Sequence, residues 1–506
     1  MTAMARPAIV FSLILAGSLF LLGFGGQDIE GPATVLMPEQ GSPYVAFRIW
    51  FDVGSQSDPE GKEGLAVLTA GMLAEGSTTE NPYDRILELL YPMAAGYGVS
   101  VDKEMTVFSG TVHRDNLEEY YELLRQAILS PAFAEQDFNR LHAQHSNYVE
   151  RVRRFSSDEE LGKELLSREV FRGTAFEAPE EGYVGSVAEL TLDDVRSFYS
   201  THYRRGNVVV GLGGGYPEGF AERVAADFEA LPEGEPEPVP APEPRPIEGM
   251  QVLIVEKDTD VTAISFGYPI SLLRSDADFY AMMLANSWLG EHRNSSSRLY
   301  QVIREIRGMN YGDYSYIEAF PTGHRTTMPP VNVSRRQQMF QVWIRPVRNE
   351  HRLFAFRAAL RELQLLIENG LTEEQLELTR SFLHNYTVNY GSTVSHRLGY
   401  RLDDLFYGLE GSHLERIRPE LAALTLDDVN DAIRRHLQCR DMWVVFITRD
   451  AESLRDALVG NEPSPITYES EKPAEVLAED LEIEAYPINV SPENVTIISI
   501  MEVLEN

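Results

Sequence analysis

The sequence contains an internal repeat, and this repeat limits the possible folds more than any other feature. Leu190-Thr-Leu-Asp-Asp-Val195 recurs 234 positions later as Leu424-Thr-Leu-Asp-Asp-Val429. Each copy is followed by a short helical pattern, a basic or histidine-bearing end, and an apolar run typical of a strand. In each copy the threonine is a candidate N-cap, with an aspartate at the third helical position. The repeat therefore predicts a duplication, with chance reuse of a good helix start as the alternative.

A proline-rich stretch separates the two halves. Residues 236–246 alternate proline with other residues, which favours an extended polyproline conformation. We therefore expect an N-terminal domain at 27–235, a linker at 236–248 and a C-terminal domain at 249–460. The length of 506 residues is sufficient for two such cores. Strands grouped with amphipathic helices in each half favour an α+β fold, with helices packed on an antiparallel-rich sheet.

A helix rich in small residues follows the first strand pattern. Residues 44–54 are aromatic and β-branched, as in a strand, and a turn-rich segment comes next. Residues 64–78 then read Gly-Leu-Ala-Val-Leu-Thr-Ala-Gly-Met-Leu-Ala-Glu-Gly-Ser-Thr. The local order predicted from these patterns is strand, turn and helix.

This helix resembles the active-site helix of the insulinase, pitrilysin and mitochondrial processing peptidase family of zinc metallopeptidases. In that family the helix carries His-x-x-Glu-His between a Gly-x-Ala lead-in and a Gly-Thr. On the same frame, the two zinc histidines fall on Val67 and Gly71, and the general-base glutamate falls on Ala70. None of these three side chains can bind zinc or accept a proton. The resemblance extends from about Tyr44 to Ala457, and it implies two similar domains joined as a half-shell, or clamshell.

The family frame places a third zinc ligand, a glutamate, at about Arg151, and a shift of one position would substitute Glu150. A lone carboxylate does not hold zinc, so we expect no metal or cofactor in this chain. A separate hypothesis is an independent metallopeptidase site built from His142 and His145 with Glu150 beyond them. This hypothesis has the weakness that no base lies near the two histidines.

The second half contains a segment that is similar to another motif of the same family. Residues 297–311 read Ser-Arg-Leu-Tyr-Gln-Val-Ile-Arg-Glu-Ile-Arg-Gly-Met-Asn-Tyr. The resemblance implies that Arg304 and Tyr311 reach toward the zinc site in the other half, bind substrate backbone and steady the reacting carbonyl. An arginine fork and a tyrosine hydroxyl are suitable donors for these roles. We expect Gly308 to end the helix sharply, so that Tyr311 begins a strand and points inward.

Arg304 and Tyr311 cannot supply catalysis alone, because one oxyanion donor contributes about 3 to 4 kcal/mol and enzymes supply at least about 8 kcal/mol. The resemblance implies a division of labour in which a paralogous partner brings His-x-x-Glu-His and its zinc. The first hypothesis is therefore a zinc-less, substrate-binding subunit of an exported heterodimeric zinc metalloendopeptidase that cleaves peptides or unfolded proteins. The second hypothesis is a non-enzymatic peptide-binding or scaffold protein with a peptidase-like fold.

Charge and the N-terminus limit the partners and the location. The net charge of −34, from 78 acidic and 44 basic residues, disfavours nucleic-acid binding, because a phosphate backbone attracts the opposite charge. Residues 1–26 contain Arg6, then an apolar run from Ala8 to Leu22, and then several small residues of the kind found at signal-peptide cleavage sites. This is the pattern of a secretory signal peptide, so we expect export to a periplasm. An uncleaved segment that anchors the chain to a membrane is the alternative.

The segment 461–506 is an acidic tail, with eleven acidic residues and one basic residue. Such a composition predicts disorder. The apolar run at 495–501 leaves open a second interpretation, in which it docks as an added strand or helix on this chain or on a partner.

Overall fold

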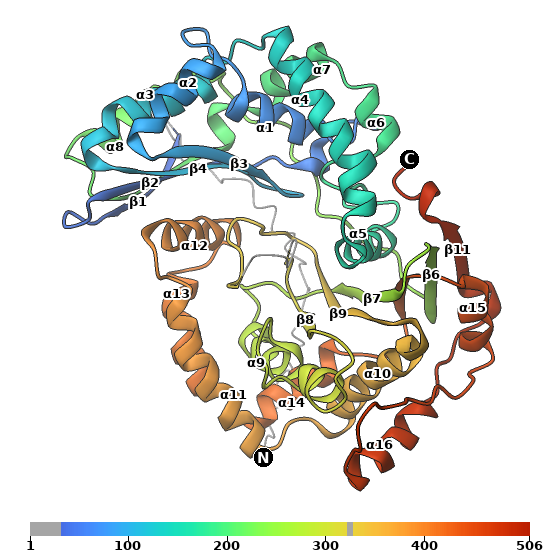
Figure 1. Ribbon diagram of the computed structural model, residues 1–506. Helices are drawn as coiled ribbons and strands as arrows, with labels where there is room; N and C mark the ends of the chain where they lie inside the picture. The colour runs from blue at the N-terminus through green and yellow to red at the C-terminus, as the bar shows by residue number, and fades with distance from the viewer. Residues whose placement is uncertain (1–31, 321–326, 506) are drawn as a thin grey trace, which may run out of the picture. The chain divides into compact units, whose positions relative to one another are not determined.

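The computed structural model describes residues 32–320 and 327–505, which form two domains that each carry helices on one mixed sheet (Figure 1). This arrangement confirms the predicted α+β fold. The strand order is β1-β5-β2-β4-β3 in the first sheet and β11-β6-β10-β7-β9-β8 in the second. The strands are β1 (Ala33–Pro38), β2 (Tyr44–Phe51), β3 (Gly96–Val101), β4 (Thr106–His113), β5 (Val208–Gly214), β6 (Met250–Glu256), β7 (Val261–Ile270), β8 (Asp313–Tyr316), β9 (Gln338–Arg348), β10 (Met442–Thr448) and β11 (Val495–Ser499).

The two sheets share one pairing pattern, as a duplication requires. In the first sheet β1 and β5 are parallel, whereas β5-β2, β2-β4 and β4-β3 are antiparallel. In the second sheet β6 and β10 are parallel, whereas β10-β7, β7-β9 and β9-β8 are antiparallel. Strand β11 is the one addition to this pattern in the described chain.

Helices follow and separate the strands in both halves. Those of the first half are α1 (Leu65–Glu75), α2 (Tyr83–Leu90), α3 (Leu117–Leu129), α4 (Glu135–Asn147), α5 (Asp158–Val170), α6 (Val184–Ala188), α7 (Leu192–His202) and α8 (Phe220–Phe228). Those of the second half are α9 (Phe279–Gly290), α10 (Arg352–Asn369), α11 (Glu373–Tyr386), α12 (Val394–Phe406), α13 (His413–Ala423), α14 (Leu426–His436), α15 (Ala451–Val459) and α16 (Ala474–Glu484).

The repeated sequence forms the same helix start twice. Thr191 caps α7 and Thr425 caps α14, each in a reciprocal capping box with the aspartate three residues on. The hydroxyl-to-carboxylate distance is 2.6 Å in both copies. The predicted caps are therefore confirmed, and they begin equivalent helices in the two domains.

Each half contributes one helix to the sheet of the other half. Helix α5 packs on β7, β9 and β10 of the second sheet, and α12 packs on β1, β2 and β5 of the first. Figure 1 shows α12 lying against the first sheet and α5 beside the second. This exchange joins the two domains.

The exchange explains why the central strands are apolar without alternation. In β10, Val444 and Phe446 face the helices of their own domain, whereas Val445 and Ile447 pack with residues of α5. A strand buried on both faces has no solvent side on which to place polar residues. The run Met442–Ile447 satisfies this requirement.

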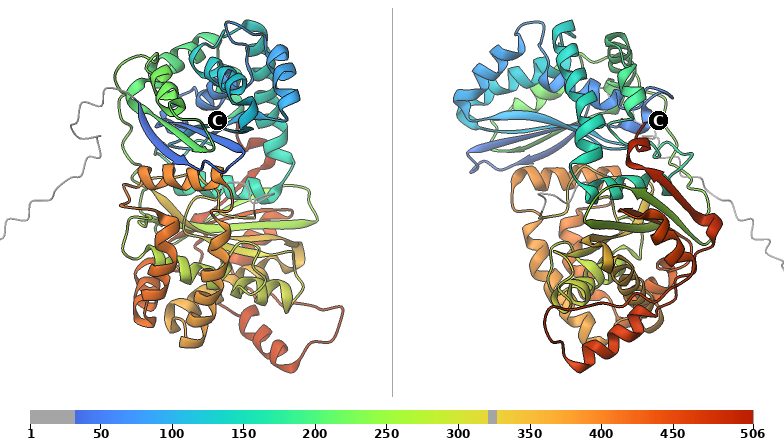
Figure 2. Two further views of the ribbon diagram at one scale, coloured as in Figure 1. Left: turned by 90° about the vertical axis from the view of Figure 1, so that its left-hand side faces the viewer. Right: turned by 45° about the vertical axis from the view of Figure 1, so that its right-hand side comes forward.

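The acidic tail contradicts the prediction of disorder. It forms α16, and the apolar run forms β11, which pairs in parallel with β6 along the outer edge of the second sheet. Figure 2 shows this C-terminal segment in red along the outside of the second domain. Beyond β11, Val503 and Leu504 are buried with residues of α5. The prediction failed because composition reports average polarity, whereas the few apolar residues of the tail meet a complementary sheet edge.

Two further predictions concern the linker and the N-terminus. Residues 236–248 contain no helix or strand. The signal-peptide segment 1–26 lies outside the described residues. Within residues 32–320 and 327–505, no helix is both long and apolar enough to cross a bilayer.

Candidate functional site

Helix α1, which carries the degenerate motif, is well formed. Asp58 closes its N-terminus, because its two carboxylate oxygens accept hydrogen bonds from the amides of Gly64 at 2.8 Å and Ala66 at 2.7 Å. Gly64 has a φ of 96°, a left-handed conformation that glycine adopts without strain. Burial raises the pKa of Asp58 to about 8. Helix α1 therefore begins at Leu65, directly after Gly64, within the stretch where the sequence predicted a helix.

The three motif positions lie where the helix would have to present zinc ligands. Val67 and Gly71 are half-buried and one turn apart on the same face, whereas Ala70 is fully buried. A Cβ atom built on Gly71 meets nothing within 4 Å, so the space for a side chain remains. Because these residues offer no nitrogen, oxygen or sulfur ligand atom on their side chains, they do not fit a zinc ion.

The proposed histidine site is wrong. The Nε2 atom of His142 lies 2.7 Å from the carbonyl oxygen of Val187, and that of His145 lies 2.8 Å from the carbonyl oxygen of Glu181. These contacts join α4 to the segment around α6. Across the described parts of the chain, no three His, Cys, Asp or Glu side chains are grouped so that they could hold a metal.

Glu150 and Arg151, the two candidate positions for a third zinc ligand, do not complete a metal site. Glu150 and Arg151 lie in a π-helical segment, Tyr148–Arg153, and both are exposed. Among the described residues, Glu150 belongs to no group of three or more His, Cys, Asp or Glu side chains that could hold a metal. The region therefore has no structural counterpart of a zinc site.

Arg304 lies in a second π-helical segment, Tyr300–Glu305, a type of distortion that is frequent at functional sites. Its side chain is 35% exposed and lies 3.3 Å from the carboxylate of the adjacent Glu305. The guanidinium carbon lies 6.0 Å from the centroid of the Tyr300 ring. The Nε atom of Arg304 is buried without a hydrogen-bond partner.

Neighbouring arginines, in contrast, are held by carboxylates from other elements. Arg307 is buried and binds Asp480 and Glu479 of α16, both at 2.8 Å. Similar pairs are Arg298–Glu362 at 2.5 Å, Arg361–Glu479 at 3.3 Å and Arg361–Glu482 at 2.6 Å. The Nζ atom of Lys472 also donates to the carbonyl of Ile306 at 2.7 Å. The acidic tail therefore holds the segment that carries Arg304.

Tyr311 is 79% exposed and precedes the strand rather than beginning it. Gly308, with φ of 70°, ends the helical segment as predicted. Gly312, with φ of 147°, then turns the chain again before β8 begins at Asp313. The expectation that Tyr311 begins the strand is therefore wrong, because the second glycine turn separates it from β8 and leaves its ring exposed to solvent.

The structure does not bring the motif positions of α1 into contact with Arg304 and Tyr311. Val67, Ala70 and Gly71 belong to the first domain, whereas Arg304 and Tyr311 belong to the second. Arg304 and Tyr311 form no hydrogen bond or ion pair with α1 among the described residues.

Sequence reasoning missed a charged network between the domains. Arg335 binds both carboxylate oxygens of Asp102, at 2.6 and 2.9 Å, and also Glu180 at 3.0 Å. Burial alone would raise the pKa of the Glu180 carboxyl group. The charges of Lys103 and Arg335 outweigh this effect and lower that pKa to about 2. Arg336 pairs with the buried Glu104. A sequence signal existed, because the acidic turn before β4 and the basic turn before β9 occupy equivalent places in the duplication.

Several of these residues line a cavity of about 310 Å³ between the domains, together with side chains of α5 and β9. Its lining combines charged side chains, including Asp102, Arg153, Lys163, Glu180 and Arg335, with apolar ones such as Phe320, Met339 and Trp343. The cavity lies next to the exchanged helix α5.

Known families match both halves of the chain. Residues 34–181 match the family described as Insulinase (Peptidase family M16), and residues 189–383 match the Peptidase M16 inactive domain. The chain belongs to the M16, or insulinase, family of peptidases.

Individual relatives differ in their named activity. The "non-peptidase homolog YmxG" of Helicobacter pylori is 23% identical over 419 residues, 82% of this chain and 90% of that one. The "uncharacterized zinc protease SCO5738" of Streptomyces coelicolor is 25% identical over 422 residues, 81% of this chain and 86% of that one. Family membership alone therefore does not determine catalytic status.

Solved structures support the fold, and some relatives are subunits. A Pseudomonas fluorescens structure described as a peptidase M16 inactive domain has a TM-score of 0.72 and 23% identity, covering 83% of this chain and 96% of that one. The mitochondrial-processing peptidase subunit beta of Caenorhabditis elegans is 21% identical over 176 residues, 35% of this chain and 38% of that one. M16 proteins thus also occur as subunits of larger assemblies.

Proposed function

We propose that this chain is the zinc-less, substrate-binding subunit of an exported, periplasmic heterodimeric zinc metalloendopeptidase. In this proposal Arg304 and Tyr311 act in trans at the zinc site of a paralogous partner that carries His-x-x-Glu-His. Attachment to a membrane through the N-terminal segment is compatible with this role. The substrate is a peptide or an unfolded protein.

The observation that carries the proposal is the state of Arg304. Its neighbours Arg298, Arg307 and Arg361 pair with carboxylates from other elements, whereas the pairing of Arg304 is with the adjacent Glu305. A half-exposed pair of this kind contributes little to stability. The buried Nε atom without a partner also makes a purely structural role a poor explanation for Arg304.

The chemistry of the pair suits an accessory role. The planar guanidinium of Arg304 can donate two hydrogen bonds to a peptide carbonyl. The exposed hydroxyl of Tyr311 can donate to an oxygen that gains negative charge. Val67, Ala70 and Gly71 hold no metal, so the zinc and the general base must come from the partner in this proposal.

The test is a reconstituted complex of this chain with an M16 partner that carries an intact His-x-x-Glu-His. We expect Arg304→Ala to lower kcat/KM for a fluorogenic peptide about 100-fold, as loss of one transition-state donor does. Tyr311→Phe removes only the hydroxyl, and we expect a decrease of about tenfold or more. Complex formation is measured in parallel by size-exclusion chromatography with light scattering.

Matched controls come from the same chain. Arg434→Ala removes an exposed arginine that pairs on its own helix, and Tyr91→Phe removes the hydroxyl of an exposed tyrosine. Both controls should retain wild-type activity. If the Arg304→Ala, Tyr311→Phe double variant assembles and is fully active, the pair has no role, and the scaffold hypothesis replaces this proposal.

A further inference from the structure

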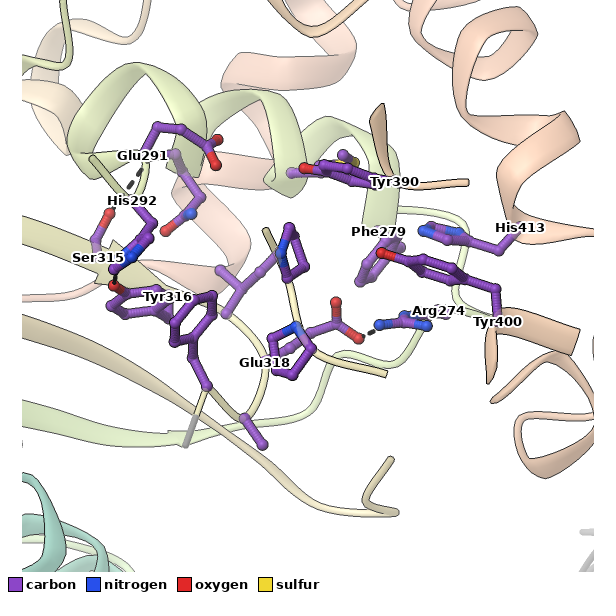
Figure 3. A pocket seen from close by; sticks show the side chains of 17 residues that line it. Arg274, Phe279, Glu291, His292, Ser315, Tyr316, Glu318, Tyr390, Tyr400 and His413 are labelled. Carbon is purple, nitrogen blue, oxygen red and sulfur yellow. Dashed lines mark hydrogen bonds and ion pairs between the residues drawn. The ribbon is translucent and has the colours of Figure 1, made fainter. Parts of the chain in front are cut away.

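The second domain contains a small cavity of about 80 Å³ (Figure 3). Asn286 and Glu291 line it from α9 and its end, and Tyr316 and Glu318 line it from β8 and the residues that follow. The opposite wall includes Tyr390, Tyr400 and His413. This volume is several times the space that one water molecule requires.

The duplication shows which elements of the first domain correspond to those beside this cavity. Helix α9 packs on the edge strand β8, as α1 packs on the edge strand β3 in the first domain. The approach is close, because a Cβ atom on Gly290 would lie 2.5 Å from the amide nitrogen of Ser315. The cavity therefore lies in the second domain beside the counterpart of the helix that carries the degenerate zinc motif.

Among the described residues that line the cavity, one carboxylate has no counter-charge. Glu318 is neutralised by Arg274 at 2.8 Å, and Arg274 also lies 3.4 Å from Asp403. Glu291, in contrast, forms no ion pair with any arginine or lysine of the described chain. It also follows the C-terminus of α9, where the exposed carbonyl groups of a helix favour a positive charge.

Two further acceptors in the cavity are unused. The hydroxyl of Tyr400, a residue that is 2% exposed, has no hydrogen-bond partner, and neither has the Oδ1 atom of Asn286. Figure 3 shows the Tyr400 hydroxyl and the Glu291 carboxylate directed into the cavity from opposite sides. A buried polar atom without a partner is costly, so these atoms are suited to a ligand that donates hydrogen bonds.

We propose that this cavity binds an organic ammonium group, carried either by a lysine side chain or by a small primary amine. An ammonium group has three hydrogens to donate, and the acceptors in the cavity include the carboxylate of Glu291, which the Ser287 hydroxyl also reaches, and the unused Oδ1 atom of Asn286. The aromatic residues Tyr316 and Tyr390 also line the cavity. Calcium or magnesium is a poorer ligand, because each needs six or more oxygen ligands and this cavity offers one unpaired carboxylate among the described residues.

This site is independent of the proposed peptidase role. It involves neither Arg304 nor Tyr311, and it lies within the second domain alone. The isolated full chain can therefore be tested without any partner subunit, and failure of one proposal leaves the other standing.

The experiment is calorimetric titration of the isolated chain with butylammonium, with 1-butanol as the neutral probe. A capped tripeptide with a central lysine and its norleucine analogue distinguish the two sources of the ammonium group. Binding of both cationic probes assigns the cavity to a lysine side chain, whereas binding of butylammonium alone assigns it to a free amine. The proposal is overturned if neither cationic probe binds, or if the neutral probes bind equally well.

Variants separate this site from general attraction to an acidic protein, because the chain has a net charge of −34. Glu291→Gln should weaken binding about tenfold or more, whereas Glu410→Gln removes an equal charge from the surface and should leave binding unchanged. Tyr400→Phe removes a hydroxyl that has no partner, so the fold should be retained while binding weakens severalfold. Equal affinities of wild type and the Glu291→Gln variant would refute the proposal.

Discussion

At the scale of single residues, the motif positions of α1 differ in what they can accept. Gly71 lies inside the helix with open space beside it, whereas Ala70 is fully buried against its neighbours. The two positions therefore tolerate different side chains. Position 71 has room for a side chain, whereas the side chain at position 70 is completely enclosed.

This difference predicts opposite effects of two substitutions. Gly71→Ala should raise the free energy of unfolding by about 1 kcal/mol, because a helix-interior glycine is replaced without a clash. Ala70→Glu should lower it by about 3 kcal/mol or more, because it buries a carboxylate with no partner. Urea denaturation followed by circular dichroism measures both. Equal effects of the two substitutions would contradict this account of α1.

Glu291 predicts a dependence of stability on pH. Burial raises its pKa from 4.5 to about 7, so the folded chain binds more protons than the unfolded chain between these values. The stabilisation is complete below about pH 4.5 and is lost as the pH rises through 7. The titratable groups around Glu291 are the phenols of Tyr316, Tyr386 and Tyr390, the histidines His292 and His413, and the Arg274–Glu318 pair.

Glu291→Gln should therefore become more stable relative to wild type as the pH rises from 5 to 8. The limit of the gain at pH 8 is about 3 kcal/mol, which follows from the rise of the Glu291 pKa from 4.5 to about 7. Urea unfolding at both pH values measures the difference, with Glu410→Gln as the control. A difference that is the same at pH 5 and pH 8 would show that burial does not perturb Glu291.

At the scale of elements, the acidic tail supports the Arg304 segment. Helix α16 supplies Glu479 and Asp480 to the buried Arg307, and Asp480 also accepts a hydrogen bond from Tyr468 at 2.7 Å. A carboxylate paired with a buried guanidinium is costly to remove. The charge of the tail, which composition alone associates with disorder, is here a set of specific partners for arginines.

Asp480→Asn should loosen this segment, because the Arg307 guanidinium would lose one of its two charged partners. We expect amide hydrogen exchange in residues 300–311 to increase about tenfold, which corresponds to about 1.4 kcal/mol of local stability. Mass spectrometry of peptides from this segment provides the measurement. Glu475→Gln, an exposed position on the same helix, should leave the exchange unchanged. Unchanged exchange in Asp480→Asn would show that the tail does not position Arg304.

At the scale of the whole molecule, the exchange of α5 and α12 makes each domain depend on the other. Leu161, Leu165 and Leu166 of the first half are buried against the second sheet, and Leu402 of the second half is buried against the first. The ion pairs of Arg335 with Asp102 and Glu180 join the same surfaces. We therefore expect the two domains to unfold as one cooperative unit.

Leu165→Ala tests this coupling. Its free energy of unfolding should fall by about 2 to 5 kcal/mol, and hydrogen exchange should increase by a similar factor in both sheets. The control Leu378→Ala changes a leucine on the exposed side of α11 and should have little effect. Increased exchange confined to the second sheet would mean that the domains unfold independently.

Several elements could be predicted from sequence because their causes are local. The capping boxes at Thr191 and Thr425 depend on residues three positions apart, and the end of α10 at Gly370 depends on one left-handed residue. The exposure of Tyr311 could not be predicted, because Gly312 redirects the chain immediately before β8. The cavity beside Glu291 could not be found either, since its residues come from distant segments.

The sequence by itself determined the duplication, the α+β fold and the absence of ligand atoms at Val67, Ala70 and Gly71, because each depends on residue identity and short-range spacing. The tertiary structure alone decided that α5 and α12 cover each other's sheets, that the acidic tail forms β11, and that Arg304 is left without a carboxylate from another element. These features depend on which surfaces meet after folding. Local propensity and composition carry no information about such long-range contacts.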